Sequence, residues 1–99
     1  MKIKFAGAAK TVTGSKHIIQ LWDNKQVMLD CGMYQGMGKE THALNSEDFA
    51  DPESISAILL SHVHIDHSGL IPKFVKDWFK GAIFCTEATH ALCEIMLRD

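Results

Sequence analysis

Runs of apolar residues divide the chain into a group of short strands followed by a strand–helix–strand–helix segment. Residues 2–5 alternate polar and apolar positions, which predicts a half-buried strand. Residues 15–22 and 26–31 are β-rich runs joined by a short turn, which predicts a hairpin. Residues 55–60 are apolar apart from Ser56, as is typical of a strand buried on both faces.

Two helices are predicted in the second half of the chain. Residues 70–80 carry apolar side chains at helical spacing. After a short predicted strand at 82–85, Thr86 is a candidate N-cap for a helix over 87–98. The segment 33–54 is punctuated by glycine and proline and predicts no more than a single helical turn. Strands followed by alternating strands and helices predict an α/β layered domain.

Composition limits the size and the setting of this domain. The chain has 99 residues, of which 46% are hydrophobic, and this predicts one small globular domain. Its net charge of −2 provides no basic surface for nucleic acid. The three cysteines are odd in number and lack paired spacing, so we expect reduced thiols in a cytoplasmic protein. No apolar run is long enough to span a membrane.

The densest chemistry follows the strand predicted at 55–60. Three histidines and one aspartate lie within six residues, namely His62, His64, Asp66 and His67. Imidazole nitrogen and carboxylate oxygen suit zinc and neighbouring metals. If the strand continues to His64, then His62 and His64 share one face, whereas Asp66 and His67 converge on the same region only if the chain turns there. The pattern predicts ligands for one metal ion or for two adjacent ions; the alternative is a set of surface histidines.

Asp30 is the second candidate for the site. It ends the apolar strand predicted at 26–31, where a carboxylate is either a turn residue or an acceptor for the ring N–H of a ligand histidine. Acceptors of the second kind fix the tautomer and orientation of zinc ligands. The residues alone leave both interpretations open. His17, a single histidine within a predicted strand, is not included among the ligands.

The His-X-His-X-Asp-His motif at residues 62–67 resembles the metal-binding motif of the metallo-β-lactamase superfamily. The longer stretch 60–72 is similar to the β-CASP branch, which contains RNA-processing exonucleases and the nuclease of messenger-RNA 3′-end cleavage. Residues 7–15 and 29–32 resemble the opening strands of the same proteins. The resemblance implies a four-layer αββα sandwich, with residues 1–99 as the N-terminal part of that domain and its first half.

The resemblance also implies a site and a reaction. His62 and His64 would bind one of two zinc ions, and Asp66 and His67 would bind the other. Asp66 would also accept the proton of the attacking water, and Asp30 would support the ligands. The remaining ligands and the inserted β-CASP domain would lie outside these residues. The full-length protein would then hydrolyse RNA phosphodiester bonds, and the 99-residue chain alone would be a nearly inactive fragment.

Two other functions remain open at this point. The same four ligands serve superfamily hydrolases that act on thioesters, lactones or lactams. The second alternative is a non-catalytic, zinc-stabilised assembly module. Half of a sandwich leaves an apolar sheet face and unpaired strand edges, so we expect the isolated chain to associate with itself or to exchange elements between copies.

Overall fold

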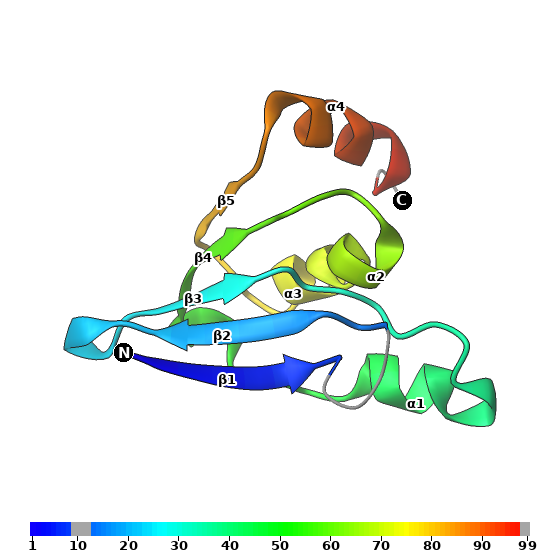
Figure 1. Cartoon of the computed structure of the whole chain (residues 1–99), viewed down its shortest axis with the longest axis horizontal. Coiled ribbons are helices and arrows are strands. Elements are labelled where there is room, and N and C mark those ends of the chain that lie inside the picture. Colours follow the sequence, from blue (N-terminus) through cyan, green and yellow to red (C-terminus); the bar gives the residue numbers. More distant parts are fainter. Residues whose placement is uncertain (9–12, 98–99) are drawn as a thin grey trace.

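The computed structural model describes residues 1–8 and 13–97, and within these residues it forms one five-stranded sheet with helices (Figure 1). The strands lie in the sheet in chain order. The first three strands are antiparallel, whereas the last two run parallel to β3. The strands are β1 (Lys2–Gly7), β2 (Lys16–Gln20), β3 (Gln26–Leu29), β4 (Ile55–Leu59) and β5 (Ala82–Phe84).

The helices are short. They are α1 (Thr41–Ser46), α2 (Ile65–Ser68), α3 (Ile71–Lys76) and α4 (Glu87–Met96), with 3₁₀ turns at Trp22–Asn24, Gly38–Glu40 and Pro52–Ser54. In Figure 1, α2 and α3 lie together on one side of β3 and β4, while α4 lies apart from them beyond β5. No helix in the described part of the chain is long and apolar enough to cross a bilayer.

The core lies on the side of the sheet that α3 covers. Ile18, Met28 and Ile58 are neighbours in the strand register and are at most 3% exposed. They form one cluster with Ile71 and Phe74, which are on α3. Burial of these side chains removes apolar surface from water and stabilises the fold by about 25 cal/mol per Å² of buried apolar surface. This packing fixes α3 and the preceding α2 against β3 and β4.

The opposite face of the sheet is open. Phe5, Leu59 and Phe84 belong to the neighbouring row of the register and are 64%, 38% and 58% exposed. The prediction of a fourth strand buried on both faces is therefore wrong, as is that of a half-buried first strand. Both predictions fail for the same reason, which is that no described element covers this face. A sheet with helices on one face confirms the α/β class and matches one half of an αββα sandwich.

The predicted hairpin is confirmed, because β2 and β3 pair antiparallel from His17 opposite Leu29 to Gln20 opposite Gln26. The helix predicted over 70–80 is shorter than expected. It ends after Lys76, and Trp78 adopts a left-handed φ of 82°. The Phe79 amide donates to the Phe74 carbonyl at 3.1 Å, which is the bond that closes a Schellman motif.

The other two predicted segments differ less from the structure. The segment 33–54 contains one short helix, α1. The last helix begins as predicted, since the Thr86 side chain accepts a hydrogen bond from the Thr89 amide at 3.2 Å. Of the stretch at 7–15 that carries part of the resemblance, residues 9–12 lie outside the described residues.

Candidate metal centre

The candidate ligands follow the end of β4. The strand ends at Leu59, and the Leu60 amide then donates to the Phe84 carbonyl at 2.9 Å. Val63 is 6% exposed and anchors the following loop in the protein interior. Ser68, at the end of α2, is fully buried and donates from Oγ to the Val63 carbonyl at 2.6 Å. This bond closes the turn that the convergence of Asp66 and His67 requires.

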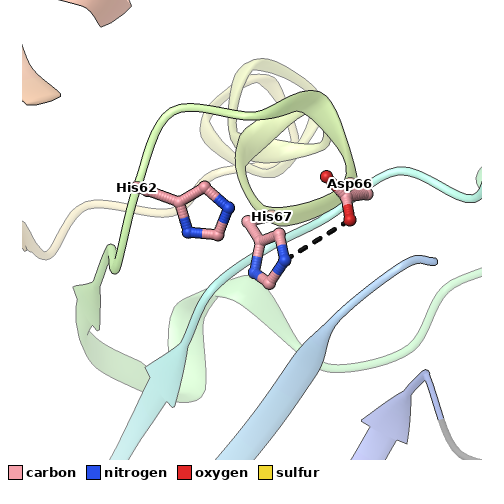
Figure 2. A group of neighbouring side chains, drawn as sticks. All are labelled: His62, Asp66 and His67. Atoms are coloured by element: carbon pink, nitrogen blue, oxygen red, sulfur yellow. Dashed lines mark ion pairs between the residues drawn. The ribbon is translucent and has the colours of Figure 1, made fainter. Parts of the chain in front are cut away.

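Three of the four predicted ligands come together at this turn. His62, Asp66 and His67 each offer one donor atom, and these atoms all lie within 4.8 Å of one another (Figure 2). His67 Nε2 is 3.4 Å from Asp66 Oδ2, and the ring centroids of His62 and His67 are 4.0 Å apart. All three side chains are half-buried, so they remain accessible from solvent.

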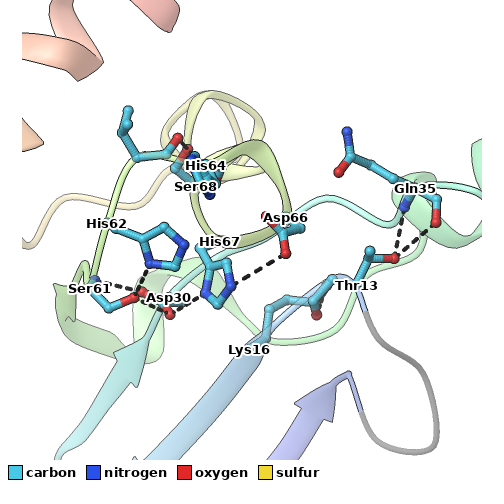
Figure 3. A network of polar contacts seen from close by, with 12 residues as sticks. Thr13, Lys16, Asp30, Gln35, Ser61, His62, His64, Asp66, His67 and Ser68 are labelled. Carbon is cyan, nitrogen blue, oxygen red and sulfur yellow. Dashed lines mark hydrogen bonds and ion pairs between the residues drawn. The ribbon is translucent and has the colours of Figure 1, made fainter.

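The fourth predicted ligand, His64, lies outside this group. Its ring is 4.9 Å from that of His62, centroid to centroid, and its side chain is exposed. The shared face proposed for His62 and His64 required the strand to reach His64. Because β4 ends at Leu59, the two side chains extend from a loop instead. The group in the structure therefore joins His62 to Asp66 and His67 (Figure 3).

Asp30 lies directly behind the cluster. It follows β3, has a left-handed φ of 62° and is 3% exposed. Its Oδ2 is 2.7 Å from His67 Nδ1, and its Oδ1 accepts a hydrogen bond from the Ser61 amide at 2.7 Å. Since Nδ1 of His67 is engaged with this carboxylate, Nε2 is the nitrogen left to bind a metal.

Ser61 is a polar residue of this network to which the sequence assigned no role. Its hydroxyl is 2.8 Å from Asp30 Oδ2 and 3.0 Å from His62 Nδ1 (Figure 3). Nothing in the spacing of the motif indicates this contact. It depends on Asp30, which is remote in the sequence.

The backbone after Asp30 supports the ligand-bearing turn. Cys31 donates from its amide to the His67 carbonyl at 2.8 Å, and the Ser15 amide donates to the Asp66 carbonyl at 2.9 Å. A Cβ atom on Gly32 would lie 1.7 Å from the Asp66 carbonyl oxygen. Gly32 is therefore required here because two backbone segments approach closely.

Lys16 is a buried cation beneath the same segments. It is 1% exposed, and its Nζ donates to the carbonyls of Gly32 at 2.9 Å and Gly14 at 3.2 Å. The ammonium also lies 4.3 Å from the centroid of the Tyr34 ring. Burial lowers the pKa of Lys16 to about 8, and burial raises the pKa of the neighbouring Cys31 thiol to about 12.

The donor set fits a transition-metal ion. Two imidazole nitrogens and one carboxylate oxygen equal the three protein ligands usual at a catalytic zinc, which keeps a further position open. Imidazole also suits copper, iron and nickel, and carboxylate also suits manganese, so the donors alone do not select zinc.

The family can now be identified by comparison. Residues 18–97 match the family model described as the metallo-beta-lactamase superfamily. The chain belongs to this superfamily. The resemblance of the 62–67 motif to this superfamily is thereby confirmed.

Several relatives of this chain are RNA-processing proteins. A ribonuclease of Thermus thermophilus is 43% identical over 100 residues, covering 100% of this chain and 22% of the relative. Cleavage and polyadenylation specificity factor 73 of Drosophila melanogaster is 38% identical, and the match covers 100% of this chain and 14% of the relative. Endoribonuclease ysh1 of Schizosaccharomyces pombe is 37% identical, and the match covers 94% of this chain and 12% of the relative. The chain thus spans about a fifth or less of the length of these relatives, and they support the predicted β-CASP branch.

Proposed function

We propose that these residues form the metal-binding part of a hydrolase that cleaves RNA phosphodiester bonds. The observation that carries the proposal is the convergence of His62, Asp66 and His67 at the end of β4. Relatives that align with 94% or more of the chain are named ribonuclease or endoribonuclease, which favours RNA over a thioester or lactone as substrate. The activity is proposed for the whole protein that contains this chain.

In this proposal His62 and His67 bind a metal through Nε2 and Asp66 binds it through its carboxylate. The metal is proposed to be zinc, with two ions in the complete site, and His64 and residues outside the described ones would supply the other ligands. A bound divalent ion neutralises charge on phosphate oxygens and lowers the pKa of water. Asp66 is 26% exposed, so its carboxylate can accept a proton from the attacking water. Asp30 holds the His67 ring in position.

The remaining parts of the proposal concern the partners and the setting of the chain. Its net charge of −2 provides little attraction for the RNA backbone, so the RNA-binding groove is proposed to lie in another part of the protein. The isolated chain would then be inactive. Its open sheet face, with Phe5 and Phe84 exposed, supports self-association of the isolated chain, which sedimentation velocity would measure. The free cysteines favour a reducing compartment, the cytoplasm.

The decisive experiment uses the protein as its gene encodes it, loaded with zinc. We expect it to cleave end-labelled RNA and not a generic thioester. His62→Ala and Asp66→Ala should lower the rate by at least about 100-fold, because each removes one of few metal ligands. His90→Ala, which removes an exposed histidine on α4, is the matched control and should retain the rate. Cleavage of the thioester alone would contradict the proposal.

A second measurement tests the metal site separately from activity. The 99-residue chain should retain zinc through gel filtration, and His62→Ala should lower the zinc content per chain. The same zinc content in His62→Ala and in the unchanged chain would exclude His62 as a ligand.

A further inference from the structure

The hydrogen bonds around Ser61 determine where the protons lie. The Asp30 carboxylate only accepts hydrogen bonds, and its Oδ2 is 2.8 Å from Ser61 Oγ. A serine hydroxyl has one hydrogen, which must point to this oxygen, because two oxygen lone pairs would otherwise face each other at that distance. Ser61 Oγ can then only accept a hydrogen bond from His62 Nδ1, which is 3.0 Å away.

The same counting applies to His67. Its Nδ1 lies 2.7 Å from Asp30 Oδ2, so that nitrogen carries the proton. In a neutral imidazole the other nitrogen has the free lone pair. Both rings are therefore held with a proton on Nδ1 and with Nε2 free. His67 is held directly by Asp30, and His62 is held through Ser61.

We propose that Ser61 is a positioning residue that extends the influence of Asp30 to His62, so that one carboxylate selects the metal-binding tautomer of both histidines. This inference rests on the proposed role of His62 and His67 as ligands. Without the hydroxyl, nothing holds the ring proton of neutral His62 on Nδ1, and both tautomers form. In its other tautomer the proton occupies Nε2, the nitrogen that the metal requires. Metal binding then has to move this proton first, which weakens affinity.

Ser61 can be altered without disturbing the fold. Its backbone amide, not its side chain, donates to Asp30 Oδ1 at 2.7 Å, so this bond survives replacement by alanine. The residue is exposed, so removal of the hydroxyl leaves no cavity. A change at Ser61 therefore tests the hydroxyl alone, and threonine, which keeps the hydroxyl, tests for rescue.

The first test reads the tautomers directly in the metal-free chain. Nitrogen NMR on histidine-labelled protein, about two units above the usual histidine pKa, should show Nδ1–H for both His62 and His67. In Ser61→Ala the His62 signals should change to a mixture of tautomers while those of His67 stay. Ser61→Thr should restore His62, and Ser56→Ala, an exposed serine on β4, should change neither ring. An unchanged His62 in Ser61→Ala would overturn the inference, as would equal changes in both rings.

The second test uses zinc alone, titrated against a chelator. Ser61→Ala should weaken binding by about 10-fold or more, the range found when groups that orient metal ligands are removed. Ser61→Thr should stay within about threefold. If the unchanged chain fails to bind zinc, the proposed metal site is wrong, whereas the NMR result still decides the role of the Ser61 hydroxyl. Equal zinc affinity of Ser61→Ala and the unchanged chain would refute that role.

Discussion

Because Lys16 is buried, the stability of this chain changes with pH in the alkaline range. The side chain is 1% exposed, and burial lowers its pKa from 10.5 to about 8. Below about pH 8 the ammonium is charged in both the folded and the unfolded chain, so the full cost of burying it is present. Between pH 8 and 10.5 the unfolded chain binds a proton that the folded chain does not. The contribution of Lys16 to stability therefore rises with pH in this window.

The size of the effect follows from the two pKa values of Lys16. The decrease from 10.5 to about 8 corresponds to about 3 kcal/mol in total. From about pH 7 to about pH 9, roughly 1.3 kcal/mol of this is recovered. Cys31 acts in the opposite direction, because its raised pKa removes stability as pH rises from 9.0 towards about 12. The rise is therefore clearest between about pH 8 and 9, and stability falls above about pH 10.5.

Replacement of Lys16 by methionine tests this reasoning, because methionine has a similar length and no charge. The free energy of unfolding is measured by urea titration at about pH 7, 8 and 9. The unchanged chain should gain about 1 kcal/mol between about pH 7 and 9, while Lys16→Met should gain nothing. Lys39→Met removes an exposed lysine and should keep the gain. Parallel pH profiles for the unchanged chain and Lys16→Met would refute the assignment.

Two further predictions concern the metal centre. Gly32→Ala should lower the free energy of unfolding by more than about 2 kcal/mol, because its Cβ would meet the Asp66 carbonyl at 1.7 Å; urea titration checks this, and an unchanged midpoint would contradict the close approach. His64→Ala should change the zinc affinity of the 99-residue chain by less than about threefold, whereas His62→Ala should weaken it at least about 10-fold. Equal losses in chelator competition would contradict this prediction, because they would show that His64 already binds zinc in the 99-residue chain.

The position of the candidate site was predictable because its histidines are close together in the sequence. The sequence could not predict which of His62 and His64 lies beside Asp66 and His67, because this depends on where β4 ends. An apolar run does not mark that residue. Strand β4 ends at Leu59, and the ring centroid of His62 then lies 4.0 Å from that of His67.

Burial was harder to predict than secondary structure. The sequence pattern located the strands, α3 and α4, but it also predicted a half-buried first strand, in which Phe5 is 64% exposed. An apolar pattern does not by itself show which side chains other elements cover. Here Phe79 is 5% exposed although it follows the end of α3, whereas Phe5 faces the uncovered side of the sheet. The pattern alone cannot separate these cases.

Asp30 joins the fold to the site because two requirements coincide at one residue. Parallel pairing of β3 with β4 sets Leu29 opposite Leu59, so the residues that follow both strands emerge at the same edge of the sheet. The chain must then turn at Asp30 with a φ of 62°, a conformation that aspartate and asparagine adopt more readily than most residues. Asparagine would satisfy the backbone, but its amide has only one acceptor oxygen. A carboxylate accepts at both oxygens, from the Ser61 amide at Oδ1 and from the Ser61 hydroxyl and His67 Nδ1 at Oδ2, and its negative charge strengthens these bonds. The turn therefore explains a small polar residue at this position, and the contacts to Ser61 and His67 explain why it is an acid.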